Sequence, residues 1–154
     1  MNEKIVIAAD GYDHIDGRNA YHSAIKRLTL GAPTIEANKN MLIAAQVWKQ
    51  QEDGALEISC ELPIHQVLDL TIFLSRTLLY FKEAYRMPLL YDPDSPIVER
   101  VGIQGDAMTV SVCTDNPRLN DDILEFSQLI SDLGELTGER LRTLTRILNE
   151  LECY

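Results

Sequence analysis

The chain has 154 residues, of which 45% are hydrophobic and 25% charged, so we expect one ordinary globular domain over residues 1–154 and not a disordered chain. Its formal net charge of −10 repels phosphate backbones, because proteins bind nucleic acids through lysine and arginine side chains that release counterions. We therefore expect no nucleic-acid partner, and look instead to a basic protein surface, a cation or a small molecule.

An apolar segment at residues 4–9, predicted to be extended, leads into the acidic loop ADGYDHIDGRN at residues 9–19. The loop combines three regularly spaced aspartates with a histidine and an arginine: Asp10, Asp13, His14, Asp16 and Arg18. The carboxylates and the imidazole could hold a divalent cation while the arginine orients a phosphate. Alternatively, the two Asp-Gly pairs form turns in which aspartate bonds its own backbone. The chain shows no second ligand cluster, so we favour the turns.

Residues 20–28 are predicted to form a short helix. Their apolar side chains recur with helical spacing on one stripe, made by Tyr21, Ala24, Ile25 and Leu28. Asn19 is the expected N-cap, and Gly31 and Pro33 are expected to end the helix.

Residues 41–51 are ambiguous, because their composition also favours a helix. The segment ALEISCEL that follows alternates strictly between apolar and polar side chains, which is typical of a half-buried strand. The Asp53-Gly54 pair between the two segments is typical of a hairpin turn. We therefore predict a hairpin over about residues 41–62.

A long central helix is predicted over residues 63–87. Pro63 is tolerated in a first helical turn, and apolar side chains cover most of the circumference. Asp69 and Arg76 lie within its most apolar stretch and would burden a membrane span. We expect a buried helix and no membrane partner.

The segment IVERVGIQGDAMTVSVCT predicts a second hairpin over about residues 97–114. With Gly105-Asp106 as its two-residue turn, Ile103 faces Met108 and Val101 faces Val110, which places both apolar pairs on the same face.

Two helices are predicted to complete the chain. Asn116 or Asn120 is the expected N-cap of the first, with Asp121 and Asp122 in its first turn. Glycines 134 and 138 mark a break or bend, and the last helix carries a leucine stripe made by Leu141, Leu144, Leu148 and Leu151. The predicted fold class is therefore α+β, with an antiparallel sheet from the two hairpins packed against the central helix and the two C-terminal helices.

Four segments carry a resemblance to other sequences: YDHIDGRNA, LYFKEAYR, LYDPDSPIVERVGIQGDAMTVSVCT and GERLRTLTRIL. On these segments the chain resembles an uncharacterised family of small bacterial proteins with a domain of unknown function. The resemblance spans most of the chain and implies a bacterial, cytoplasmic origin. It transfers no activity and no catalytic residue.

A group of aromatic and basic side chains provides a candidate pocket for a small molecule. Tyrosine offers an apolar body and a polar tip, and arginine can receive an anion. The candidate residues are Arg76, Tyr80, Tyr85, Arg86 and Tyr91. The alternative is that these aromatic side chains belong to the core.

The three cysteines Cys60, Cys113 and Cys153 show neither CxxC pairing nor zinc-ligand spacing, which suits a reducing cytoplasm. We assign no catalytic residue and no cofactor. The favoured hypothesis is a non-enzymatic cytoplasmic binding or interaction protein that self-associates as a homodimer or binds a protein partner. The alternative is a metal-dependent hydrolase or phosphate-handling enzyme that uses a divalent cation in the acidic loop.

Overall fold

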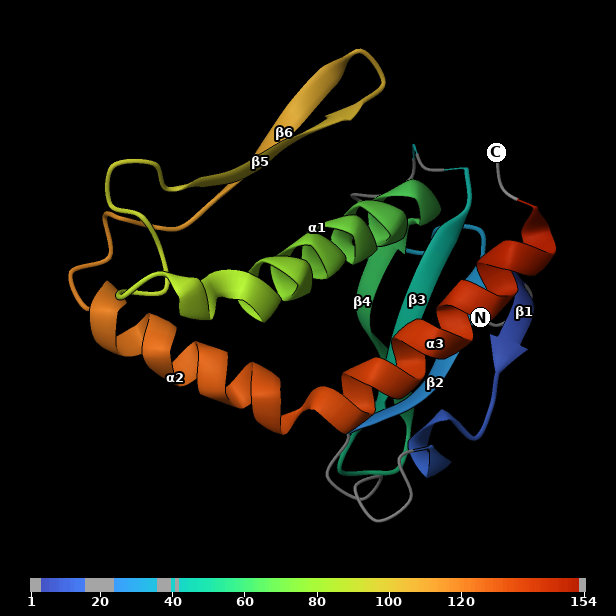
Figure 1. Ribbon diagram of the computed structural model, residues 1–154. Coiled ribbons are helices and arrows are strands. Elements are labelled where there is room, and N and C mark those ends of the chain that lie inside the picture. The colour runs from blue at the N-terminus through green and yellow to red at the C-terminus, as the bar shows by residue number, and fades with distance from the viewer. Residues whose placement is uncertain (1–3, 16–23, 36–39, 41, 153–154) are drawn as a thin grey trace. The chain divides into compact units, whose positions relative to one another are not determined.

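The computed structural model describes residues 4–15, 24–35, 40 and 42–152 (Figure 1). The chain divides into two compact units, residues 1–72 and residues 73–154, and the division falls inside helix α1, Ile64–Glu83. Strands and helices are both present, with antiparallel pairing throughout, which confirms the α+β class. The expectation of one domain over residues 1–154 stays a prediction.

Unit 1 contains a four-stranded antiparallel sheet in the order β1-β2-β3-β4. Its strands are β1 Ile5–Ala9, β2 Ile25–Gly31, β3 Ala44–Gln50 and β4 Leu56–Pro63. A short 3-10 helix, η2 Tyr12–His14, follows β1, and the first part of α1 follows β4.

The hairpin predicted over residues 41–62 is confirmed as β3 and β4. Val47 pairs with Cys60 and Ala45 with Leu62, so apolar side chains lie opposite one another on one face. Gly54 in the connection adopts a φ of 87°, a left-handed conformation that glycine tolerates without strain.

The helix predicted over residues 20–28 is wrong where the structure describes it, because Ile25–Gly31 is strand β2. Leu28 and Leu30 pair with β3 on one side and with β1 on the other, and this pairing with two strands outweighs the weak preference for an isolated two-turn helix. Gly31 does not end a helix. A Cβ there would overlap the carbonyl oxygen of Lys4, so glycine permits the close pairing of β1 with β2.

The other face of this sheet carries a buried polar network. Thr29, Gln46 and Glu61 lie side by side on β2, β3 and β4 and are all buried. The Thr29 hydroxyl donates to Gln46 Oε1 (2.6 Å), Gln46 Nε2 donates to Glu61 Oε2 (2.8 Å), and Trp48 Nε1 donates to Thr29 Oγ1 (2.8 Å). These hydrogen bonds satisfy polar groups whose burial would otherwise be costly.

Unit 2 contains the second part of α1 and the remaining elements. They are the 3-10 helix η5 Ala84–Arg86, the strands β5 Ile97–Ile103 and β6 Asp106–Ser111, and the helices α2 Leu119–Asp132 and α3 Gly134–Leu151. The long helix predicted over residues 63–87 is thus confirmed as α1 continued by η5, but the expectation that it is buried is wrong, because no residue of α1 is buried and Leu68, Leu70 and Leu74 are exposed. The predicted break at Gly134 is the start of α3, whereas Gly138 lies inside that helix.

The second hairpin is confirmed, but two of its predicted details are wrong. β5 and β6 form a separate two-stranded sheet instead of joining the first hairpin in one sheet. Its turn is Gln104-Gly105, not Gly105-Asp106, so Val101 pairs with Met108 and not with Val110. Gln104 and Gly105 have φ values of 54° and 86°, as a type I′ turn requires at both central positions, and this turn matches the twist of the flanking strands.

The start of α2 combines confirmed and corrected details. Asp121 and Asp122 lie in its first turn, as predicted. Arg118 occupies the N-cap position without a side-chain cap. Asn116, two residues before it, accepts a hydrogen bond from Arg118 N at its Oδ1 (2.9 Å).

Among the described residues, the helices are too short or too polar to cross a bilayer.

Candidate ligand-binding cavity

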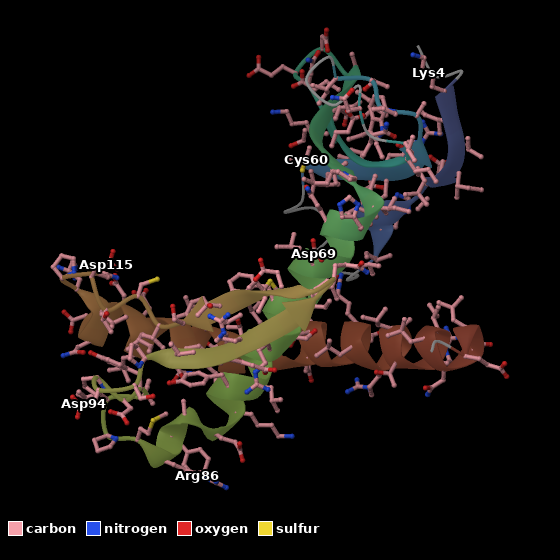
Figure 2. The ribbon with its side chains drawn as sticks, turned by 90° about the horizontal axis from the view of Figure 1, so that it is seen from above. Lys4, Cys60, Asp69, Arg86, Asp94 and Asp115 are labelled. Atoms are coloured by element: carbon pink, nitrogen blue, oxygen red, sulfur yellow. The ribbon has the colours of Figure 1, made fainter. Side chains whose placement is uncertain are left out.

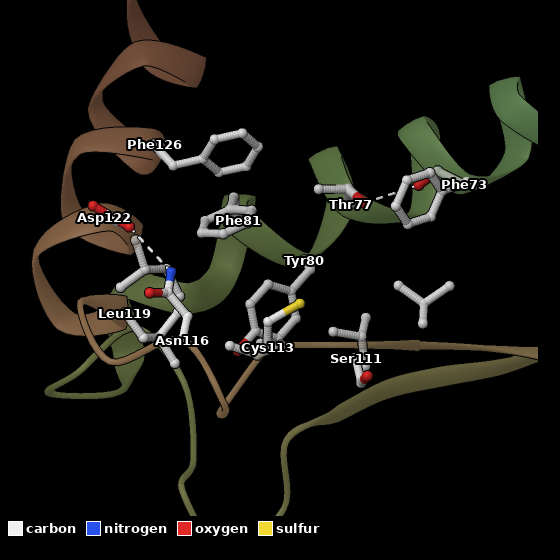
Figure 3. A pocket seen from close by; sticks show the side chains of 14 residues that line it. Phe73, Thr77, Tyr80, Phe81, Ser111, Cys113, Asn116, Leu119, Asp122 and Phe126 are labelled. Atoms are coloured by element: carbon white, nitrogen blue, oxygen red, sulfur yellow. Dashed lines mark hydrogen bonds between the residues drawn. The ribbon is translucent and has the colours of Figure 1, made fainter.

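A cavity of about 370 Å³ lies within unit 2, and Figure 3 shows its walls. Three elements build it: the second half of α1, the end of the β5–β6 hairpin with the residues that follow it, and the first turns of α2. Aromatic and branched aliphatic side chains make most of the lining, including Phe73, Phe81, Phe126, Val110 and Ile123. Such walls favour the binding of apolar groups, because the ligand's apolar surface leaves water.

Packed aromatic rings form the α1 and α2 sides of the cavity. The ring of Phe81 meets the ring of Tyr80 edge to face, with centroids 5.2 Å apart and planes at 84°. It also meets the ring of Phe126 at 5.3 Å and 65°. These are the geometries that aromatic quadrupoles favour, so the rings fix one another in place.

Tyr80 contributes a polar tip to this wall. Its hydroxyl donates a hydrogen bond to the carbonyl oxygen of Leu90 at 3.0 Å. Burial raises the pKa of the Tyr80 phenol, and the negative charge of Asp92 raises the pKa further. The phenol is therefore neutral at physiological pH, and its proton is already engaged.

Two other polar side chains of the lining, Thr77 and Asn116, are also bonded locally. The Thr77 hydroxyl donates to the carbonyl oxygen of Phe73 (2.9 Å). Asn116 Nδ2 donates to Asp122 Oδ2 (3.0 Å) at the α2 end of the cavity, a hydrogen bond drawn in Figure 3.

The five residues proposed from the sequence for a small-molecule pocket do not all converge here. Tyr80 lines the cavity, whereas Arg76 pairs through Nε with Glu99 Oε1 at 2.8 Å. The Tyr91 side chain is buried and its hydroxyl donates to Asn120 Oδ1 at 2.9 Å.

Tyr85 and Arg86 lie elsewhere, in the η5 turn. Tyr85 is 72% exposed, and the Arg86 guanidinium lies 5.9 Å from the centroid of its ring. Figure 2 shows Arg86 at the outer end of this segment. Arg86 Nη2 also lies 3.5 Å from Glu83 Oε1.

Sequence reasoning missed most of the cavity wall, although part of the signal was present. Leu119, Ile123 and Phe126 recur with the spacing of one helix face, and all three line the cavity. Val110 and Val112 lie two residues apart in the segment predicted as the second hairpin, which is the spacing of one strand face, and both line the cavity. What these patterns could not indicate is that the two faces meet around an open space.

The described part of the acidic loop carries ion pairs with basic side chains. Asp10 Oδ1 accepts a hydrogen bond from Arg27 Nε at 2.7 Å, and Asp13 Oδ2 lies 3.5 Å from Lys26 Nζ. His14 Nε2 lies 3.6 Å from Asp13 Oδ1. Within the described residues, His, Cys, Asp and Glu side chains form no group of three that could hold a metal ion. Asp16 and Arg18 lie outside the described residues.

Comparison with known proteins places the chain in a family but gives it no activity. No curated protein and no solved structure matches the chain significantly. One family model, described as a family of unknown function (DUF6530), matches residues 1–154, the whole sequence given. The chain therefore belongs to this family of unknown function.

Proposed function

We propose that this protein is a non-enzymatic binding protein and that the cavity of unit 2 holds a small apolar ligand. The observation that carries the proposal is the cavity itself, whose volume of about 370 Å³ and apolar lining are typical of small-molecule sites. Thr77, Tyr80 and Asn116 use their donor groups on neighbouring protein atoms. This arrangement suits the retention of an apolar molecule better than its chemical conversion.

Titration calorimetry with 1-octanol tests the proposal. We expect saturable binding to the wild-type protein, and we expect Val112→Phe to weaken it about tenfold or more, because the larger side chain fills space that the ligand needs. Val101→Phe is the matched control: it makes the same substitution in the same hairpin but outside the cavity lining. Absence of saturable binding, or equal effects of the two variants, would contradict the proposal.

We also propose that the protein self-associates as a homodimer through α3. Three large apolar side chains of this helix are exposed, Ile147 by 43%, Leu148 by 40% and Leu151 by 60%. Exposed apolar surface of this kind favours association with another protein surface. The two described cysteines, Cys60 and Cys113, are free, which supports a cytoplasmic setting, and we propose a bacterial one from the resemblance described above.

The alternative function is a metal-dependent hydrolase or phosphate-handling enzyme built on the acidic loop. A divalent cation there would have to displace Arg27 from Asp10 and Lys26 from Asp13. An apolar ligand in the cavity would break no ion pair formed by the described lining residues, so the binding function is the better supported of the two.

A further inference from the structure

We propose that the cavity of unit 2 selects an apolar amine, with Asp122 as the counter-ion of its ammonium group. The inference rests on the proposed binding function of this cavity and adds the charge of the ligand. Its starting point is the lining: among the described residues that form the wall, Asp122 alone is charged at neutral pH.

One oxygen of the Asp122 carboxylate is available to a ligand. Oδ2 accepts the hydrogen bond from Asn116 Nδ2 at 3.0 Å, which holds the carboxylate at the α2 end of the cavity (Figure 3). Oδ1 makes no hydrogen bond or ion pair within the described part of the chain. An ammonium group can therefore donate a charge-assisted hydrogen bond to Oδ1 without displacing another partner.

The rest of the wall also favours a cation with an apolar body. Phe81 and Phe126 line the cavity, and the faces of aromatic rings in general attract ammonium groups. The lining side chains of Val98, Val110, Val112 and Ile123 can bury a hydrocarbon chain.

A ligand of the opposite charge is less well served at the same place, because three backbone N–H groups of the described α2 start are already bonded. The N-terminus of a helix can bind an anion through its free N–H groups. At the start of α2, however, Leu119 N donates to Asn116 O (3.0 Å), and Asp121 N and Asp122 N donate to Arg118 O (3.1 and 2.9 Å). The two aspartates would also repel an anion.

The dipole of α2 opposes a cation only in part. It places about half a positive charge at the helix N-terminus, whereas the Asp122 carboxylate carries a full negative charge in the first turn. Arg118 lies in the same region but its Nη2 is 4.0 Å from Asp121 Oδ2, so its charge is shared with the other aspartate.

Three probes with one hydrocarbon chain and different head groups test the inference: octylammonium, 1-octanol and octanoate, each titrated into the full-length protein at neutral pH. We expect octylammonium to bind about three- to fivefold more tightly than 1-octanol, which is the upper part of the range for an ion pair open to solvent, and octanoate to bind most weakly. Asp122→Asn should abolish the preference, so that octylammonium and 1-octanol bind this variant with equal affinity. Asp121→Asn, which removes a charge from the same turn outside the lining, should preserve the preference.

The outcomes separate the two proposals. If 1-octanol binds and Val112→Phe weakens it, but octylammonium gains nothing or Asp122→Asn changes nothing, the amine inference is overturned and the binding function stands. If Asp121→Asn abolishes the preference as fully as Asp122→Asn, general surface charge explains it, and the inference is again overturned. If none of the three probes binds to the wild-type protein, both proposals fall. Saturable binding of 1-octanol to Asp122→Asn, together with a circular dichroism spectrum like that of the wild type, verifies that this variant is folded.

Discussion

At the scale of single residues, Glu61 is the side chain on which the most described hydrogen bonds of unit 1 converge. Its Oε2 accepts from Thr34 N (3.0 Å), Thr34 Oγ1 (3.2 Å) and Gln46 Nε2 (2.8 Å), and its Oε1 accepts from Ile35 N (3.0 Å). The carboxylate thereby fixes the backbone that follows β2 to strand β4. An acceptor-only group with two oxygens is the only side-chain chemistry that serves all four donors at once.

We predict that Glu61→Gln lowers the free energy of unfolding by about 2 kcal/mol, although the side chain keeps its shape. One end of the glutamine amide is an NH₂ group, which faces N–H donors and leaves at least one of them without a partner. Urea unfolding measures the effect. Glu57→Gln on the same strand is the control: it removes a surface ion pair with Lys49 (3.5 Å) and should cost less than about 0.5 kcal/mol. Equal effects of the two substitutions would show that the hydrogen bonds of Glu61 contribute no more stability than a surface ion pair does.

At the scale of elements, both hairpins and the long helix followed from sequence patterns. Strict alternation with an Asp-Gly pair predicted β3 and β4, and apolar side chains around most of the helix circumference predicted α1. These signals are local, so they predict an element without information from the rest of the chain. Residues 25–28 show the opposite case: an apparent helical stripe over so few residues gave way to pairing with two neighbouring strands.

Local sequence patterns could predict neither the exact turn of the second hairpin nor the cavity. Both Gln104-Gly105 and Gly105-Asp106 place a glycine in the turn, and the two registers differ by two residues, so each keeps the apolar side chains on the same face.

The cavity depends on how α1, α2 and the hairpin meet within unit 2. Tyr80 was predicted as a pocket residue from its chemistry alone, whereas Ile123 and Phe126 were visible only as one apolar helix face.

The exposed face of α3 leads to a prediction about association. If Leu148 and Leu151 lie in a dimer interface, replacing both with aspartate buries charge there and should shift a dimer toward monomer in sedimentation velocity, by at least tenfold in the dissociation constant. Thr143→Asp with Asn149→Asp is the matched control, since both residues are exposed on α3 away from the leucine stripe. A wild-type protein that sediments as a monomer at high concentration would refute self-association.

At the scale of the whole molecule, the chain has 24 acidic and 14 basic residues, and this excess of negative charge determines how its thermal stability responds to dissolved ions. Like charges repel in the folded chain, and salt screens this repulsion. Two ion effects must therefore be separated: general screening, which any salt provides, and binding at the acidic loop, which depends on particular carboxylates. Asp10 and Asp13 already have Arg27 and Lys26 as partners, so we expect screening to dominate.

We predict that raising NaCl from about 10 to about 200 mM increases the melting temperature by about 2–4 °C, as relief of repulsion worth about 1 kcal/mol would do in a chain of this length. Mn²⁺, Zn²⁺ and Ca²⁺ salts at matched ionic strength should give the same increase. A cation that binds the folded state specifically would add a further, concentration-dependent increase by mass action. If such an excess is measured, and Asp13→Ala with Asp16→Ala removes it while leaving the NaCl response intact, the acidic loop is a metal site. The hydrolase or phosphate-handling function would then replace the non-enzymatic one, because a protein-held divalent cation would provide both an activated water and an anchor for phosphate.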